Sequence, residues 1–150
     1  MIRMTFAALA VAASAGIAAA AVTGLEAIKE RQDLMKADGD VSKPLVAMLQ
    51  GKASFDLAAV QKALKTYEDV ASKGPALFPP DSKTGDKTQA LPAIWEDDNK
   101  ADFDARFKKF GQDAESALAS IKDEASFKAN IPAVFKNCGS CHEKYKAKQQ

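Results

Sequence analysis

Five residues near the C-terminus, Cys138-Gly139-Ser140-Cys141-His142, constrain this chain more than any other stretch. On a helix, positions i, i+3 and i+4 share one face, so both thiols and the imidazole would point the same way. Two thiols at this spacing can add to the two vinyl groups of one porphyrin, and the adjoining imidazole can then bind its iron. The stretch therefore predicts a covalent haem c attachment site, one per chain.

The same two cysteines also fit other kinds of site. They could form a redox dithiol or half of a zinc site. A closed zinc site needs about four ligands, whereas the whole chain has two Cys and one His. A thioredoxin-like dithiol needs a strand before it, and no strand pattern precedes Cys138. A chance occurrence of the motif is the remaining alternative.

The N-terminal segment has the features of an export signal. Arg3 gives a positive start, an uncharged apolar run follows, and Ala18-Ala19-Ala20-Ala21 forms a small-residue cleavage pattern. We expect residues 1–20 to be a cleaved secretory signal peptide and residues 22–150 to form the haem domain. An uncleaved membrane anchor is the alternative. Because haem is attached to such motifs outside the bacterial cytoplasm, we expect the protein in the periplasm.

The charges of the chain nearly cancel. The sequence has 21 basic and 20 acidic residues, so no overall field attracts nucleic acid, and we expect no nucleic-acid partner. Lys136, Lys144, Lys146 and Lys148 surround the motif and could form a docking patch for an acidic redox partner of unknown identity. The solvated face of a helix is the alternative interpretation of these lysines.

Apolar residues recur at helical spacing in four stretches. The expected helices cover about 24–50, 54–73, 99–122 and 124–145. Asp38-Gly39-Asp40 and Pro44 disturb the first pattern, so we expect one long helix with a disturbed middle or two helices in line. Pro132 falls inside the fourth pattern, where we expect a kink or a restart of the helix. The segment 75–98, rich in Pro and Gly, is expected to be an irregular lid that packs down, with Trp95 in a packing role.

Four amphipathic segments without a strand pattern predict an all-α fold. We expect an antiparallel up-down-up-down four-helix bundle with a haem in the core. In this arrangement the first helix runs beside the fourth, so its inner face would supply the far side of the haem pocket.

The whole mature chain resembles the cytochrome c′ family of class II c-type cytochromes, which includes a low-spin c-556 type branch. The resemblance rests on the order and spacing of Ala76-Leu77-Phe78-Pro79, Leu91-Pro92-Ala93-Ile94-Trp95 and the stretch from Cys138 through Tyr145. Arg31-Gln32-Asp33-Leu34-Met35 is similar to the family's first-helix haem-contacting segment. Cytochrome c′ is itself a standard example of the four-helix bundle, so the resemblance implies the same fold.

The resemblance implies a role for each matching residue. Cys138 and Cys141 would hold the haem covalently, and His142 would be the proximal iron ligand. Arg31 and Gln32 match positions that contact the haem and its propionates, and a guanidinium suits that negative charge.

Met35 separates two functions within this family. It matches the position on the first helix that faces the distal side of the iron, which makes it a candidate distal ligand. In the low-spin branch a Met there binds iron through sulfur, which stabilises ferrous iron and gives an electron carrier. In high-spin members the iron is five-coordinate and binds NO or CO, and some of these also carry an unligated Met. We expect one-electron transfer, with NO or CO binding as the alternative.

We expect neither catalytic residues nor an enzyme. A peroxidase needs a distal acid–base pair, normally a second His with Arg, and the chain has one His. Family members are often homodimers through the first two helices, and a monomer is the alternative.

Overall fold

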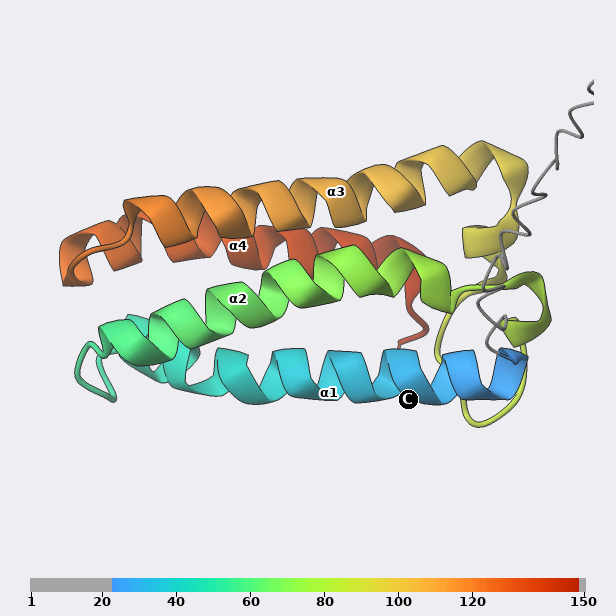
Figure 1. Ribbon diagram of the computed structural model, residues 1–150, viewed down its shortest axis with the longest axis horizontal. Helices are drawn as coiled ribbons and strands as arrows, with labels where there is room; N and C mark the ends of the chain where they lie inside the picture. The colour runs from blue at the N-terminus through green and yellow to red at the C-terminus, as the bar shows by residue number, and fades with distance from the viewer. Residues whose placement is uncertain (1–22, 149–150) are drawn as a thin grey trace, which may run out of the picture.

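The computed structural model describes residues 23–148. The expected signal peptide lies outside the described residues. Four helices follow one another up and down in an elongated bundle (Figure 1). They are α1 (Gly24–Leu49), α2 (Leu57–Lys73), α3 (Asp97–Ser120) and α4 (Glu124–Tyr145). The all-α four-helix bundle is confirmed, and an isolated bridge is the only strand-like pairing among the described residues.

Side-chain caps fix where three of the helices begin. Thr23 and Glu26 form a capping box at the start of α1, Asp56 caps α2, and Asp123 with Ser126 forms a capping box on α4. Such caps satisfy backbone N–H groups that have no partner inside the helix, and each stabilises it by about 1 kcal/mol.

α1 and α4 are each one continuous helix. Of the alternatives expected from the sequence, the single long first helix is therefore confirmed, and neither helix is broken into two. Both helices continue through their prolines, Pro44 and Pro132, and both prolines are exposed at the bundle surface. On α1, Lys36 and Lys43 each form an ion pair with Asp40, across the stretch where the pattern is disturbed. The apolar residues on either side stay buried in the bundle, and this packing outweighs the lost backbone hydrogen bond.

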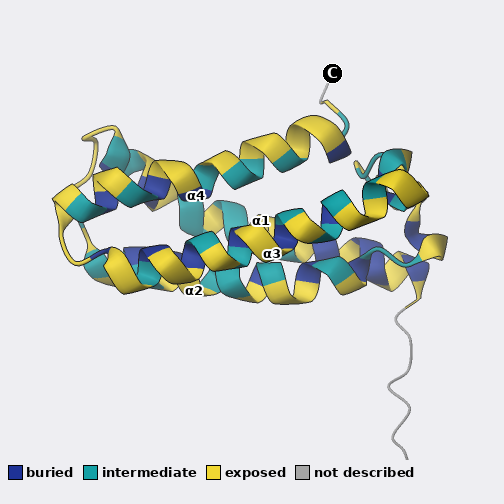
Figure 2. Cartoon of the chain, turned by 90° about the horizontal axis from the view of Figure 1, so that it is seen from above, coloured by how far each residue is buried: buried dark blue, intermediate teal, exposed yellow. Residues whose placement is uncertain are grey.

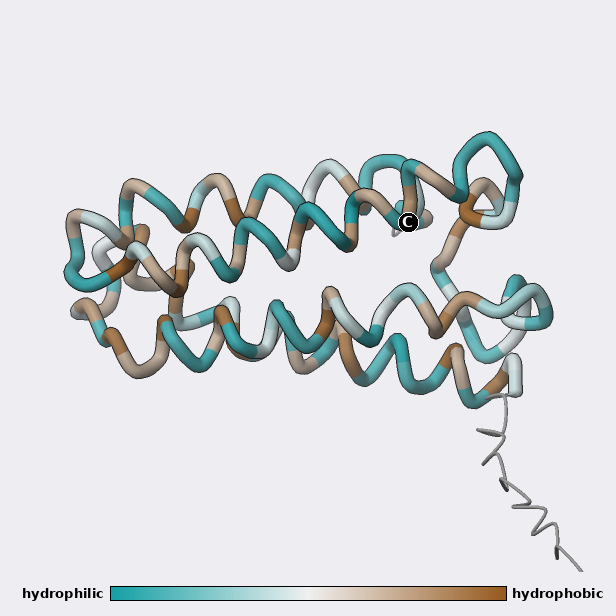
Figure 3. The backbone as a smooth tube through the Cα atoms, turned by 45° about the horizontal axis from the view of Figure 1, so that its top comes forward, coloured by the Kyte–Doolittle hydropathy of each residue, from teal (hydrophilic) through white to brown (hydrophobic). Residues whose placement is uncertain are grey.

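The core is lined by buried residues along α2 and α3, whereas α1 has none between Arg31 and Leu45 and α4 has none between Val134 and Tyr145. Figures 2 and 3 colour the backbone by burial and by hydropathy. Aromatic side chains fill the middle of the core. The Tyr67 and Phe110 rings lie 5.4 Å apart, and Phe103 makes edge contacts with Phe78 and Phe107. Among residues 23–148, no helix is long and apolar enough to cross a membrane.

The connection between α2 and α3 packs down on the bundle, as expected, but it is not wholly irregular. It contains three short 3-10 helices, η1 (Gly74–Leu77), η2 (Pro80–Ser82) and η3 (Pro92–Trp95). The Trp95 indole N–H donates to the carbonyl of Phe78 at 2.9 Å, and the two rings lie 6.0 Å apart. The packing role of Trp95 is therefore confirmed.

The helices are not equally well packed on their neighbours. α2 packs closely on α1 and on α3, and α3 packs on α4, whereas α1 and α4 hardly touch. α1 runs beside α4, as expected, but the inner faces of the two helices are not in close contact. The bundle therefore has one loosely packed side, between α1 and α4.

Candidate haem-binding site

The last two turns of α4 bring the three motif residues onto one face. Because α4 is helical through Tyr145, Cys138, Cys141 and His142 have the spacing that places them one above the other. Both cysteines are half-buried and pack against the hydrophobic core. His142 is exposed beside them. The motif therefore faces the loosely packed side of the bundle from one edge of the core.

The two thiols have properties that disfavour zinc and redox chemistry. Burial, and then the nearby charge of Asp38, raises the pKa of Cys138 to about 11. Burial also raises the pKa of Cys141. A redox dithiol or a zinc ligand needs a thiolate that forms readily. Among the described residues, no group of three or more His, Cys, Asp and Glu side chains could hold a metal ion.

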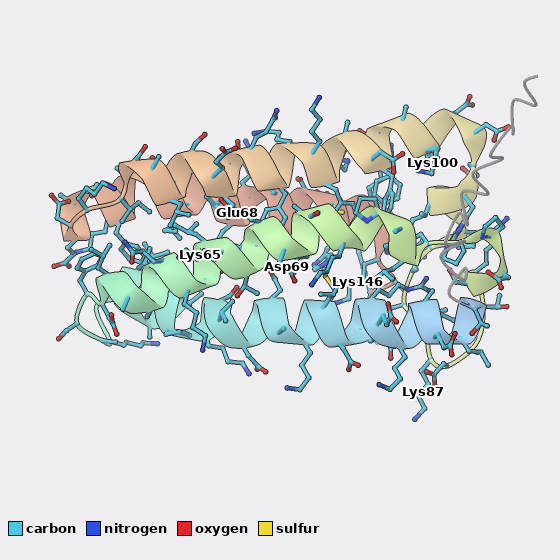
Figure 4. All side chains as sticks on the ribbon, viewed as in Figure 1. Lys65, Glu68, Asp69, Lys87, Lys100 and Lys146 are labelled. Carbon is cyan, nitrogen blue, oxygen red and sulfur yellow. The ribbon has the colours of Figure 1, made fainter. Side chains whose placement is uncertain are left out.

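The imidazole of His142 is suited to an iron ligand. Although His142 reaches the surface, the protein atoms around its ring partly shield the imidazole from water; this desolvation, and then the positive charge of Lys146, lowers its pKa. Lys146, labelled in Figure 4, follows α4 directly. Neutral imidazole is the form that binds metals, so a lowered pKa favours the ligating form at neutral pH.

A polar group of α1 lies close to the motif. The charge of Asp38 acts on the thiol of Cys138 and on Tyr67 of α2, so the three side chains are neighbours. Ser42 links α1 to α2, because its hydroxyl donates to the Asp38 carbonyl and lies 2.7 Å from the Tyr67 hydroxyl. One carboxylate oxygen of Asp38 is buried with no partner, and burial raises the Asp38 pKa to about 6.

Met35 lies one turn before Asp38 and does not pack on the core. The preceding Leu34 does pack on it, beside a surface hollow that it lines with Lys73 and Leu77. The next residue, Met35, is not part of that core packing and is 37% exposed. On α4 the two thiols and the imidazole share one face, and Asp38 of α1 lies close enough to Cys138 for its charge to act on that thiol. This donor set fits a haem c.

Arg31 and Gln32 have partners that the sequence did not indicate. Arg31 is buried and makes four hydrogen bonds to the connection between α2 and α3, at Leu77, Ser82 and Thr88. Gln32 donates to the carbonyl of Asp86 in the same connection at 3.0 Å. Both residues lie one turn before Met35 on α1. No periodicity or motif signals such long-range partners.

A second contact missed by sequence reasoning holds the motif from the side of α3. Arg106 donates to the carbonyl of Ser140, between the two cysteines, at 3.0 Å and forms an ion pair with Asp102. Asp102 also accepts from the Tyr145 hydroxyl at 2.6 Å and from Lys144 at 3.1 Å. The sequence signal was only an Asp–Arg pair at i, i+4 on a helix, which is common at surfaces.

The four lysines expected around the motif differ in their surroundings. Lys144 is paired with Asp102, and Lys146 is half-buried, whereas Lys136 and Lys148 are exposed. Fewer of these lysines are therefore available for the expected docking patch, which stays a prediction.

Comparison with known proteins assigns the family. The family model described as "Cytochrome C'" matches residues 26–146. The chain belongs to the cytochrome c′ family. The cytochrome c′ of Rhodopseudomonas palustris is 51% identical over 129 residues, which are 86% of this chain and 87% of the relative. A cytochrome c-556 of Agrobacterium tumefaciens is 37% identical over 123 residues, 81% of this chain and 98% of the relative.

A solved structure agrees with the family and the fold. The structure of cytochrome c′ from R. palustris covers 83% of this chain and 98% of its own, with a TM-score of 0.79 and 52% identity. Proteins of the cytochrome c′ family carry covalently bound haem c, and Cys138 and Cys141 fit its attachment. The chain is therefore a c-type haem protein for electron transfer or gas binding, and not an enzyme.

Proposed function

We propose that this cytochrome c′ family member is an electron carrier in which His142 and Met35 bind the haem iron from opposite sides. The observation that carries the proposal is Met35. Met35 is 37% exposed, does not pack on the core, and lies one turn before Asp38, whose charge acts on the Cys138 thiol. When bound, the haem supplies one-electron exchange between ferric and ferrous iron, and a thioether ligand favours the ferrous state.

The other site residues have supporting roles in this proposal. Cys138 and Cys141 fix the porphyrin by thioether bonds, and α4 holds both on one face. Arg31 and Gln32 border the haem at one end of the gap. Arg31 contributes its Nε–H, which has no acceptor among the described residues, because its other donors bond to the connection between α2 and α3.

The proposal includes a location and an assembly. Covalent haem attachment and the signal-like residues 1–20 support a location in the periplasm, where redox proteins of unknown identity would dock near Lys136 and Lys148. A homodimer through α1 would cover its exposed apolar side chains Leu25 and Val46.

A second candidate function is capture of NO or CO at a five-coordinate iron. The 51% identity to a protein named cytochrome c′ favours it. In that case Met35 would stand over the open iron position without binding it, and the chain would bind gas instead of carrying electrons.

Substitution of the proximal ligand tests the shared part of both candidates. His142→Ala should leave the haem attached through both thioethers, yet change the absorption spectrum in both oxidation states because the iron loses its imidazole. Glu143→Ala, at the exposed neighbouring position, is the matched control and should leave the spectrum unchanged. An unaltered spectrum in His142→Ala would show that the proximal assignment is wrong.

A further inference from the structure

One segment contacts both helices that border the gap. We call residues 82–91 the strap; it lies in the connection between α2 and α3, at the end of the bundle where α1 begins (Figure 1). Since α1 and α4 hardly touch each other, contacts through the strap are a main physical link between them at this end.

Arg31 holds the strap on the α1 side. Its Nη1 donates to the Leu77 carbonyl at 3.1 Å and to the Ser82 hydroxyl at 2.8 Å. Its Nη2 donates to the Ser82 carbonyl at 2.8 Å and to the Thr88 hydroxyl at 2.6 Å. The guanidinium carbon also lies 4.7 Å from the centre of the Phe78 ring. The planar fork of Arg matches this set of acceptors, which the single ammonium of Lys would not.

Backbone pairing holds the strap on the α4 side. The Leu91 N–H donates to the Tyr145 carbonyl at 3.0 Å, and the Ala147 N–H donates to the Gln89 carbonyl at 2.8 Å. These bonds enclose an antiparallel bridge between Ala90 and the residue after α4. The paired segment begins only three residues after His142. Movement of the strap would therefore displace the last turn of α4.

Thr88 joins the two halves of this link. Its hydroxyl oxygen accepts from Arg31 and also from the backbone N–H of Ala90, at 3.2 Å. A continuous series of hydrogen bonds therefore runs from Arg31 through Thr88 to the bridge residue Ala90. Its α1 end lies one turn before Met35, and its α4 end lies just after His142.

We propose that Arg31 is a positioning residue that, through Thr88 and the strap, fixes the separation of α1 and α4 and so the span between Met35 and His142. The inference rests on the proposed haem site and goes beyond haem contact by Arg31. The Arg31 guanidinium is 6% exposed and its hydrogen-bond acceptors are all neutral. A buried charge held in this way needs every one of its hydrogen bonds, so loss of one acceptor loosens the link.

Thr88→Val tests the link because it removes the hydroxyl and keeps the shape of the side chain. Thr66→Val is the matched control, since the Thr66 hydroxyl bonds only within its own helix, to the Lys62 carbonyl. Amide hydrogen exchange of Leu91 and Ala147 reports the strap. The CO affinity of the ferrous protein, compared in a Met35→Ala background where CO can bind, reports the distance between α1 and α4 at the haem site. In Thr88→Val we expect both to rise about tenfold, the effect of one lost hydrogen bond. Arg31→Lys should change both in the same direction.

Two results would overturn the proposal. Faster exchange with unchanged CO affinity would show that the strap does not set the span, and unchanged exchange would show that Thr88 does not join its two halves. The proposed Met35 ligand is tested separately by the ferric spectrum of the unsubstituted protein. If that spectrum is five-coordinate, Met35 still stands over the site, and the rise in CO affinity of Thr88→Val is still expected.

Discussion

At the scale of single residues, the proposed iron ligand Met35 separates the two candidate functions of the site. Met is often a core residue because it fills irregular space, but Met35 does not pack on the core cluster and is partly exposed at the gap. His142 alone would leave the iron open to gases. A sulfur ligand from Met35 would close that position and convert a gas binder into an electron carrier.

Met35→Ala should convert a low-spin six-coordinate iron to high spin and let CO bind, because the thioether is lost and space opens in its place. Absorption spectra of the ferric and ferrous protein, with and without CO, measure both effects. Met35→Leu is the control for bulk: it should also give high-spin iron, but with weaker CO binding than Met35→Ala. If neither variant changes the spin state, Met35 is not a ligand.

Asp38 should make the stability of the protein depend on pH. Burial raises its pKa to about 6 in the folded state, above the value of about 3.9 for an unfolded chain. The folded state therefore binds this proton more tightly, and the stabilisation is full below about pH 4 and lost as pH rises through about 6. We expect the free energy of unfolding to fall over this window by at most about 3 kcal/mol.

Asp38→Asn should remove this pH-dependent decrease in the free energy of unfolding. It should also raise the free energy of unfolding at pH 7, because the amide cannot ionise. Urea unfolding of the haem-loaded protein between pH 4 and pH 8 measures it. Asp33→Asn, on the same helix but exposed, should keep the fall because Asp38 is still present. A Asp38→Asn variant with the same pH dependence as the parent would rule out this role of Asp38.

At the scale of elements, two glycines distinguish close packing from helix propensity. A Cβ at Gly74, the first residue of η1, would lie 2.3 Å from a ring carbon of Phe107. We expect Gly74→Ala to destabilise the protein by about 1–3 kcal/mol, because the ring must leave its place in the core. Urea unfolding measures this change.

Gly39 gives the opposite case within α1. A Cβ there would meet nothing within 4 Å, and Ala is the better helix former. Gly39→Ala should therefore stabilise the protein by up to about 1 kcal/mol. If Gly74→Ala left the free energy of unfolding unchanged or raised it, the packing described around Gly74 would be contradicted.

The elements that could be predicted are those with a local signal. The four helices follow from apolar periodicity, and the cap residues mark where they begin. A break at Pro44 or Pro132 did not occur, because tertiary packing of the flanking turns outweighs the backbone hydrogen bond lost at each proline. The sequence shows the proline but not this packing. The 3-10 helices of the connection were not predicted, since segments of three or four residues carry no period.

At the scale of the whole molecule, the sequence identified the residues of the site better than their surroundings. Cys138, Cys141 and His142 form a local motif, so their shared face could be predicted from helix geometry alone. The roles of Arg31 and Arg106 could not, because their acceptors lie far away in sequence. The poor packing between α1 and α4 also has no local signal.

Bound haem should stabilise α1 against local unfolding more than it stabilises the other helices. In a Cys138→Ser, Cys141→Ser double variant, which cannot attach haem covalently, amide hydrogen exchange should rise mainly in α1. The reason is that α1 hardly touches α4, whereas α3 packs on both α2 and α4. Protected amides in α3 serve as the internal control, and an equal loss of protection in all four helices would contradict the expected role of the haem.

The most direct test of the proposed electron carrier is the absorption spectrum of the purified holoprotein, ferric and ferrous, with and without CO. A haem bound by His142 and Met35 predicts a low-spin spectrum with a sulfur-to-iron charge-transfer band, unmoved by CO. A high-spin spectrum that shifts with CO would contradict it and would show an open iron that binds gas.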